Sequence, residues 1–164
     1  MDDQARTKQL FSSFPTGIAV LAAIEDGERF AMPVAAFSVG VSLDPPLVSA
    51  ALTRTSTTWP RLRSAARIGV SILDEAQAGI LRQLTAPDRS RRWDGIDPVV
   101  REGSALILPG AAAWMVVELA AVHSAGDHEL ALLRLHDQGL REGSDPLVYY
   151  RARSHGLGES LEPR

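Results

Sequence analysis

The stretch that decides the fold is Ser42-Leu43-Asp44-Pro45-Pro46-Leu47-Val48-Ser49-Ala50-Ala51-Leu52-Thr53-Arg54-Thr55-Ser56-Thr57-Thr58-Trp59-Pro60. It begins as a turn with two prolines, continues as a buried strand, and ends in an arginine and several hydroxyl side chains before a short helix. Arginine, hydroxyl groups and the N–H groups of a helix start all donate hydrogen bonds, so together they favour an oxyanion. The stretch therefore predicts a phosphate-binding site directly after a strand.

The composition is that of a soluble globular protein. The chain has 164 residues, of which 45% are hydrophobic and 23% charged, and we expect one domain over 1–164 with its core at about 8–155. The net charge of −3 argues against nucleic acid as a partner. The N-terminus has no signal-peptide pattern, no apolar run is long enough to span a bilayer, and cysteine is absent. We therefore expect a cytoplasmic protein without disulfides or a membrane segment.

Several nucleotide and catalytic motifs are absent. The only lysine is Lys8, so no lysine stands where a P-loop requires one. The only Gly-x-Gly is Gly156-Leu157-Gly158, which lacks the third glycine and the strand-to-helix context of a Rossmann fold. The chain has no Gly-x-Ser-x-Gly motif for a serine hydrolase, and its histidines have no metal-ligand spacing with carboxylates, so we assign no metal.

Turn signals divide the chain into seven expected strands. Asp44-Pro45-Pro46 ends one strand because prolines cannot donate to a ladder, and Asp74 with Gln77 forms a capping-box pattern at a helix start. Most strands follow one another through turns, which predicts a mainly antiparallel β-barrel and not a βαβ sheet. The expected elements are a helical lead-in over 1–13, strands over 17–23, 30–41, 47–52, 68–73, 113–124, 129–137 and 146–150, helices over 60–66 and 74–84, and a loop over 85–104.

Five segments, in order, resemble the short-chain flavin reductase family, which are FMN-binding split-barrel proteins. They are Phe14–Val20, Ser42–Val48, Arg54–Pro60, Gly126-Asp127-His128 and Pro146–Arg151, and the resemblance covers roughly 8–155. It implies a Greek-key-like split barrel with a few short helices. It also implies hydride transfer from NADH or NADPH to FMN or FAD, a partner monooxygenase that receives the reduced flavin, and a homodimer.

By this resemblance, Arg54, Ser56 and Thr58 hold the flavin phosphate, and Thr55 is a further expected cofactor-binding residue. The alternative is that the Ser/Thr run only caps a helix, but capping requires no cation, so Arg54 favours the phosphate. Hydrogen bonds to a charged group are worth about 1.5–3 kcal/mol each, so we expect Arg54→Ala to weaken flavin binding about tenfold or more.

The resemblance also places the strand from Met32 to Ser42 along the flavin ring. Pro33, Ala35 and Ala36 stand where relatives commonly have Thr or Ser, so we expect looser flavin binding with fewer hydroxyl contacts. The run from Phe37 is one residue longer than usual, which predicts a bulge at Gly40. The ring-contacting residues expected here are Ala35, Ala36, Phe37, Ser38 and Ser42.

Two further segments complete the expected site. Gly126-Asp127-His128 reads locally as a hairpin turn, and the resemblance associates it with the nicotinamide cofactor and the flavin face. His128 is the expected catalytic residue, either as a positioner of the nicotinamide or as a hydrogen-bond donor to the flavin, since hydride transfer needs alignment more than a general base. Arg92 and Trp93 match an Arg-aromatic pair that lies beside the cofactor in relatives, although a merely solvated loop is equally consistent with them.

Two rival functions remain open from the sequence. One is a flavin-binding or electron-carrier module without reductase activity, and the Gly126-Asp127-His128 segment argues against it. The other is an enzyme that resembles pyridoxamine-phosphate oxidase on a related barrel, with tightly held FMN. That function requires a pocket for an anionic substrate, and the only basic cluster that the sequence offers for such a pocket is Arg89–Arg92.

Overall fold

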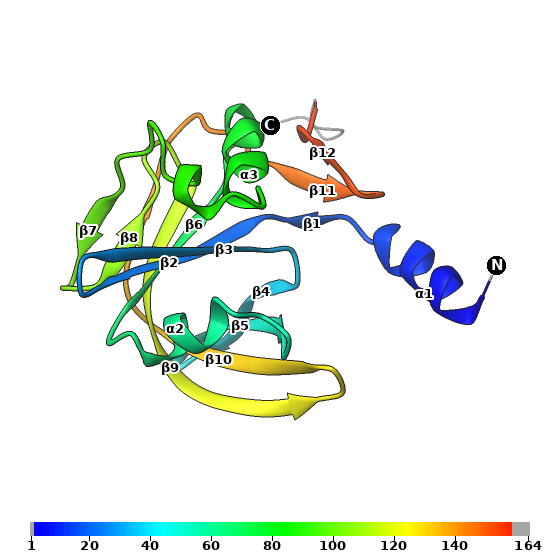
Figure 1. Cartoon of the computed structure of the whole chain (residues 1–164), viewed down its shortest axis with the longest axis horizontal. Helices are drawn as coiled ribbons and strands as arrows, with labels where there is room; N and C mark the ends of the chain where they lie inside the picture. Colours follow the sequence, from blue (N-terminus) through cyan, green and yellow to red (C-terminus); the bar gives the residue numbers. More distant parts are fainter. Residues whose placement is uncertain (1, 159–164) are drawn as a thin grey trace.

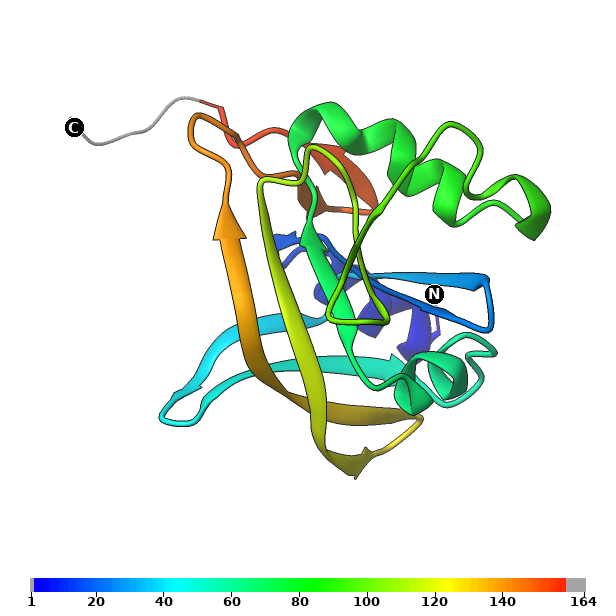
Figure 2. The same ribbon diagram turned by 90° about the vertical axis from the view of Figure 1, so that its left-hand side faces the viewer.

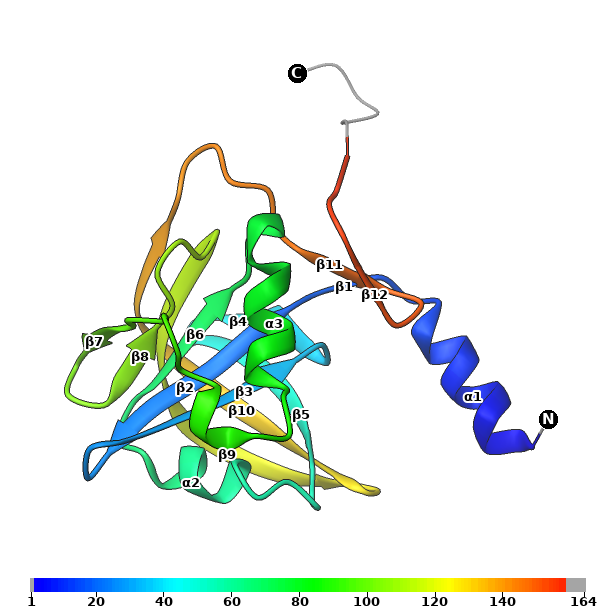
Figure 3. The same ribbon diagram turned by 45° about the horizontal axis from the view of Figure 1, so that its top comes forward.

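A computed structural model describes residues 2–158 of this protein (Figure 1). The chain begins with α1 (Asp3–Ser12), where the Asp2 side chain accepts a hydrogen bond from the Ala5 N–H at 2.7 Å, as an N-cap residue does. This confirms the expected helical lead-in. No residue of α1 is buried, and Figures 1 and 3 show the helix projecting from the rest of the molecule at the end of β1.

Nine strands form one sheet in which every neighbouring pair is antiparallel, in the order β4-β5-β10-β9-β6-β2-β8-β7 with β3 paired to β2. A small second sheet has the order β1-β11-β12. The strands are β1 (Thr16–Gly17), β2 (Ala19–Glu25), β3 (Glu28–Val34), β4 (Phe37–Leu43), β5 (Pro46–Thr53), β6 (Ile68–Ile72), β7 (Val99–Arg101), β8 (Ala105–Ile107), β9 (Ala113–Ala125), β10 (His128–Leu140), β11 (Val148–Tyr150) and β12 (Arg153–His155).

The long hairpin of β9 and β10 bends the large sheet. The two strands pair from His128↔Ala125 to Leu140↔Ala113, with register shifts at Leu132/Leu133 and Leu135/Asp137, and such irregularities increase bend and twist. Figure 2 shows the sheet curling around the core. Across residues 2–158 the ladder does not close, so the molecule is an open, mainly β barrel with short helices, which confirms the predicted split-barrel fold.

Two hydrophobic clusters fill the molecule, one on each face of β2. Along β5, Val48, Ala50 and Leu52 are buried in alternation, as the period of a half-buried strand requires. These residues pack inside the barrel with Leu21 and Leu133. The second cluster lies under α3 (Ala78–Leu84) and joins it to β2, β8 and the segment before β11 through residues Val20, Ala22, Leu84, Leu106 and Leu147.

The helices follow the predicted starts. Asp74 and Gln77 form the expected capping box, and the short 3-10 helix η1 (Glu75–Gln77) leads directly into α3. The helix expected over 60–66 is α2 (Trp59–Ser64), which ends earlier because Ala65 is extended, with ψ of 138°. Among the described residues, no helix is long and apolar enough to cross a membrane.

Two sequence predictions on the strands were wrong. The strand expected over 30–41 is two strands, because the chain turns after Val34 and the Phe37 N–H donates to Ala35 O at 2.9 Å. The break at 35–36 itself contains no Gly or Pro, so the apolar pattern runs through it. The loop expected over 85–104 contains the 3-10 helix η2 (Arg89–Arg91) and β7, and it is followed by β8, which was not predicted. The predicted irregularity at Gly40 is present, since the β4–β5 register shifts between Ser38 and Ser42.

Candidate functional site

An arginine-rich cavity of about 370 Å³ opens on β3. We call it the arginine pocket. Four arginines and one glutamate, Glu28, line it, so its formal charge is +3 in a chain whose net charge is −3. The residues that carry its chemistry are Arg29, Thr57, Thr58, Arg61, Arg89, Arg92 and Trp93. Guanidinium and hydroxyl groups all donate hydrogen bonds, so this arrangement favours an anion.

Local contacts hold the loop that carries Arg89, Arg92 and Trp93. The Gln83 amide of α3 donates to the carbonyls of Arg91, Arg92 and Asp94 at 3.3, 3.1 and 2.7 Å. The Arg92 guanidinium donates to Ala86 O at 2.9 and 2.7 Å. The Arg89 guanidinium reaches across the pocket and donates to Thr57 Oγ1 at 2.6 Å. The loop therefore meets the segment after β5, although the two lie some 30 residues apart in sequence.

Ser56 starts α2. Its hydroxyl accepts hydrogen bonds from the N–H groups of Thr58 and Trp59 at 3.2 and 3.0 Å. The backbone N–H groups of Thr58 and Trp59, which the sequence suggested as donors to an anion, are therefore hydrogen-bonded within the chain. Ser56 thus holds the turn that leads into α2, whose N-cap residue Thr58 makes no side-chain cap hydrogen bond, while Thr57 and Thr58 line the arginine pocket.

Arg54 lies beside the turn between β9 and β10. Its backbone N–H donates to Asp127 O at 3.1 Å, its Nε donates to His128 O at 3.3 Å, and its terminal nitrogen contacts the Ser124 hydroxyl. The fold therefore brings together two segments, Arg54 and Gly126-Asp127-His128, that are more than 70 residues apart. Gly126 has a φ of 61°, which glycine adopts readily, so the predicted hairpin turn is confirmed.

The Asp127 carboxylate fixes the orientation of the His128 ring. His128 Nδ1 and Asp127 Oδ1 are 2.7 Å apart, so Nδ1 carries the donated proton and Nε2 is left free of this contact. The hydrogen bond from His128 lowers the pKa of Asp127 below its ordinary value of 3.8, and the Arg54 charge adds a smaller lowering. The side chain of Asp127 is 93% exposed and that of His128 41%, so this turn is open to a ligand.

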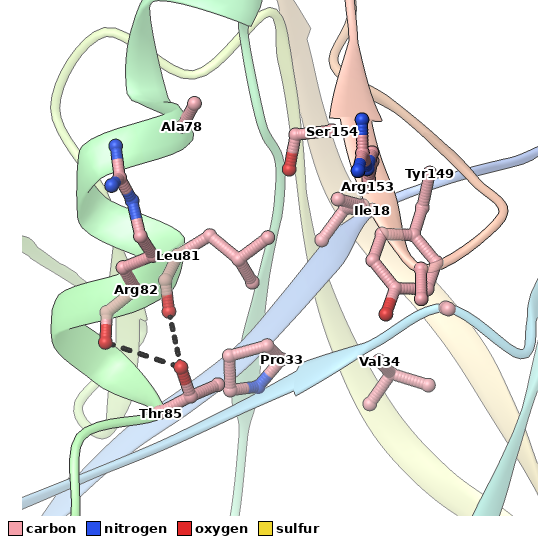
Figure 4. Close-up of a pocket in the computed structure, with 12 residues that line it drawn as sticks. Ile18, Pro33, Val34, Ala78, Leu81, Arg82, Thr85, Tyr149, Arg153 and Ser154 are labelled. Atoms are coloured by element: carbon pink, nitrogen blue, oxygen red, sulfur yellow. Dashed lines mark hydrogen bonds between the residues drawn. The ribbon is translucent and has the colours of Figure 1, made fainter.

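A second, mainly apolar cavity of about 600 Å³ lies on the same strand as the arginine pocket. We call it the apolar pocket. Figure 4 shows Pro33 and Val34 of β3 along one side, α3 with Leu81 on another, and Tyr149, Arg153 and Ser154 of the C-terminal hairpin on a third. The Thr85 hydroxyl turns away from the cavity to donate to the carbonyls of Leu81 and Arg82 at 2.9 and 3.1 Å. Pockets lined in this way suit a flat, largely apolar ring.

The model of the flavin reductase like domain matches residues 11–158 of the chain. The chain belongs to this family. It is 33% identical to the NADH-dependent flavin reductase StyB of Pseudomonas fluorescens over 94% of its length and 90% of the relative's. It is 31% identical to the reductase component of the 4-hydroxyphenylacetate 3-monooxygenase of Thermus thermophilus, over 88% of its length and 90% of the relative's.

A solved structure also matches, with 29% identity. It is BorF, the flavin reductase component of a bacterial two-component tryptophan halogenase, with a TM-score of 0.85 over 96% of this chain and 100% of that chain. Both the sequence and the fold therefore place this protein among the flavin reductases, as the five sequence segments predicted.

The structure divides the residues that the family resemblance selected into three places. Thr58, Arg92 and Trp93 line the arginine pocket, Ala35 lines the apolar pocket, and Arg54 and Ser56 lie in a smaller cavity of about 280 Å³ on the other side of the α2 start. Arg54, Ser56 and Thr58 therefore do not share one pocket. The remaining predicted residues lie outside the arginine pocket and the apolar pocket, and they are Ala36, Phe37, Ser38, Ser42, Thr55, Gly126, Asp127 and His128.

The sequence did not single out Arg29, Arg61 or Thr57. Arg29 lies on β3 and Arg61 on α2, and neither belongs to a recognisable motif. The Arg61 guanidinium lies 4.0 Å above the Phe30 ring, and that of Arg29 lies 5.8 Å above the Trp93 ring. Only the pairing of β2 with β3 and the packing of α2 beside them bring these cations together. Arg89 had a local signal, since it begins the basic run 89–92.

Proposed function

We propose that this protein is a flavin reductase that transfers hydride from NADH or NADPH to FMN or FAD and supplies diffusible reduced flavin to a partner monooxygenase. The observation that carries this is the family match over nearly the whole chain, together with two adjoining pockets of the right chemistry. Relatives at 31–33% identity are reductases, and one is the reductase component of a monooxygenase. A cytoplasmic homodimer is part of the same proposal.

The residues of the two pockets fit a flavin. The apolar pocket, with Pro33, Val34 and Leu81 in its wall, suits the tricyclic ring, and the arginine pocket suits the phosphate through Thr58 and Arg92. Ala31 lines the arginine pocket and Pro33 the apolar pocket. Because they are two residues apart on β3, they point to the same side, about 7 Å from each other. One ligand can therefore occupy both pockets.

The bound flavin supplies an acceptor for a hydride and the nicotinamide supplies the donor. The chain contributes binding and alignment, which are the main requirements of such a transfer. Arginines fix the phosphate end of the flavin, and the apolar pocket excludes water from the ring. His128, held through Nδ1 by Asp127, has Nε2 available to position the nicotinamide, and this is the catalytic role that we propose for it.

The first experiment tests the activity. Purified protein is mixed with FMN or FAD and with NADH or NADPH in the absence of oxygen, and bleaching of the flavin is followed. We expect bleaching with at least one pair. No bleaching with any of the four pairs would refute the reductase and favour a flavin carrier.

The second experiment tests His128. We expect His128→Ala to slow flavin reduction at least tenfold, while the affinity for flavin, measured by fluorescence quenching, stays within twofold. His123→Ala is the matched control, because His123 is exposed on β9 near the same turn and has no proposed role. A His128→Ala enzyme as fast as the control would remove His128 from the site.

A further inference from the structure

The arginine pocket holds more cationic donors than one phosphate uses. Each guanidinium has five N–H groups, and in the pocket only a few of these have partners. The Arg61 guanidinium pairs with Glu28 at 3.1 Å, and that of Arg29 lies 3.9 Å from Asp97. The remaining contacts of Arg89 and Arg92 are to a neutral hydroxyl and a carbonyl. The pocket therefore keeps a positive excess that suits a doubly charged, extended anion.

The positions of the cations also indicate an anion longer than a phosphate monoester. Arg92 and Thr58 already serve one phosphate in the proposed function. Arg61 of α2 and Arg89 of η2 lie on different elements around a cavity of about 370 Å³. A single phosphate group offers three oxygens, which one or two guanidinium groups satisfy. A diphosphate, whose two phosphate groups share a bridging oxygen, has enough oxygens to accept hydrogen bonds from guanidinium groups distributed in this way.

Aromatic side chains lie in the same cavity. Phe30 and Trp93 line it beside the arginines, and the indole of Trp93 is fixed by a hydrogen bond from its Nε1 to Arg29 O at 3.3 Å. A flat purine ring stacks favourably on aromatic and guanidinium planes. Diphosphate donors next to aromatic surfaces are the chemistry that recognises a nucleoside diphosphate.

We propose that the arginine pocket binds the adenosine diphosphate half of FAD, and that this protein therefore prefers FAD to FMN. The proposal rests on the proposed reductase function and names its flavin. FMN ends at its first phosphate, so it leaves Arg61 and Arg89 without a ligand. FAD continues through a second phosphate and an adenosine, which these residues and Trp93 receive.

The test compares steady-state kinetics with FAD and FMN at saturating nicotinamide. We expect the KM for FAD to be at least about tenfold below that for FMN in the native protein. Arg89→Gln and Arg61→Gln should each raise the KM for FAD about tenfold and the KM for FMN less than threefold. Arg91→Gln is the matched control, since Arg91 lies on the same loop but its side chain is 77% exposed and pairs with Asp94 outside the pocket. ADP should compete with FAD, and AMP should compete more weakly.

Three outcomes would overturn the proposal. Equal increases in KM for FAD and FMN would assign the pocket to the phosphate that both flavins share. An increase confined to the KM for NADH or NADPH would assign it to the nicotinamide dinucleotide. If no flavin is reduced at all, the reductase function fails, and calorimetric titration with ADP then tests the arginine pocket separately. ADP binding to the native protein that is lost in Arg89→Gln would support a nucleoside diphosphate site there. No ADP binding would rule out that site. Circular dichroism of each variant establishes that it is folded.

Discussion

At the scale of single residues, Arg54 shows how one cation joins three strands. Its guanidinium and backbone contact Ser124, Asp127 and His128, so it links the end of β5 to the turn between β9 and β10. The same contacts orient the carbonyl side of His128, while Asp127 orients its ring. The predicted loss of flavin affinity in Arg54→Ala stays a prediction, and in this setting the variant would also loosen the turn that carries His128.

We expect the Asp127 carboxyl to titrate below 3.8 in the native protein. A carbon-13 NMR titration of its side chain measures this. Because the folded-state pKa is lower than the unfolded value, the interaction stabilises the fold above the unfolded pKa and is lost as the pH falls through the folded pKa. His128→Ala should raise the pKa most, since the hydrogen bond from His128 is the largest cause, and Arg54→Ala should raise it less. An unchanged Asp127 pKa in His128→Ala would contradict the assigned contact.

At the scale of elements, the start of α2 depends on one side chain. We expect Ser56→Ala to lower the free energy of unfolding by about 1 kcal/mol, the typical net worth of a hydrogen bond, because the N–H groups of Thr58 and Trp59 lose their acceptor. Thr55→Ala is the control, since Thr55 is exposed and, within residues 2–158, its hydroxyl bonds only to that of Thr53, at 3.0 Å. Urea unfolding measures both variants. Equal stabilities would show that the Ser56 hydroxyl does not stabilise the turn before α2.

Substitution of glycine by alanine should change the stability in opposite directions at two positions. A Cβ on Gly69 of β6 would collide with the backbone of Leu106 in β8, and overpacking of this kind costs about 2–3 kcal/mol. A Cβ on Gly79 of α3 would meet no atom within 4 Å, and alanine in a helix gains about 0.5–1 kcal/mol over glycine. We therefore expect thermal unfolding to occur at a lower temperature in Gly69→Ala and at a higher one in Gly79→Ala. A stable Gly69→Ala would mean that β6 and β8 can separate.

The elements were predictable where a turn residue or a cap marks them. Asp26 and Gly27, with φ values of 50° and 78°, end β2 at the predicted hairpin, and Asp74 with Gln77 starts the predicted helix. The break at 35–36 was not predictable, because Ala35 and Ala36 carry no local turn signal and the chain turns there to pair β4 with β5. β7 and β8 were missed because three residues are too few for a hydrophobic period to appear.

At the scale of the whole molecule, the pockets arise from contacts between distant segments. The hydroxyl run that we propose for phosphate binding and the Arg-aromatic pair were visible as local motifs, and the fold places Thr58 with Arg92 and Trp93. Arg29 and Arg61 were invisible to sequence reasoning, because a lone arginine on a strand or a helix usually faces solvent. Their role depends on the pairing register of β2 with β3 and on the position of α2, which no short motif encodes.

Exposed apolar side chains give the last prediction. Leu10 and Phe11 of α1 are 67% and 71% exposed, and Val39 and Leu43 of β4 are 68% and 89% exposed. Contiguous exposed apolar surface marks association sites, and we expect a second copy of the chain to cover these side chains in the proposed homodimer. Light scattering should then give twice the chain mass of 17.6 kDa.

A charge at such a contact would have to be buried without a partner, so Phe11→Glu and Leu43→Glu should shift the protein toward the single-chain mass. Leu140→Glu is the control, because Leu140 is 86% exposed at the far end of β10. A native protein of single-chain mass at micromolar concentration would refute the dimer, and dissociation by Leu140→Glu alone would place its interface at the other end of the barrel.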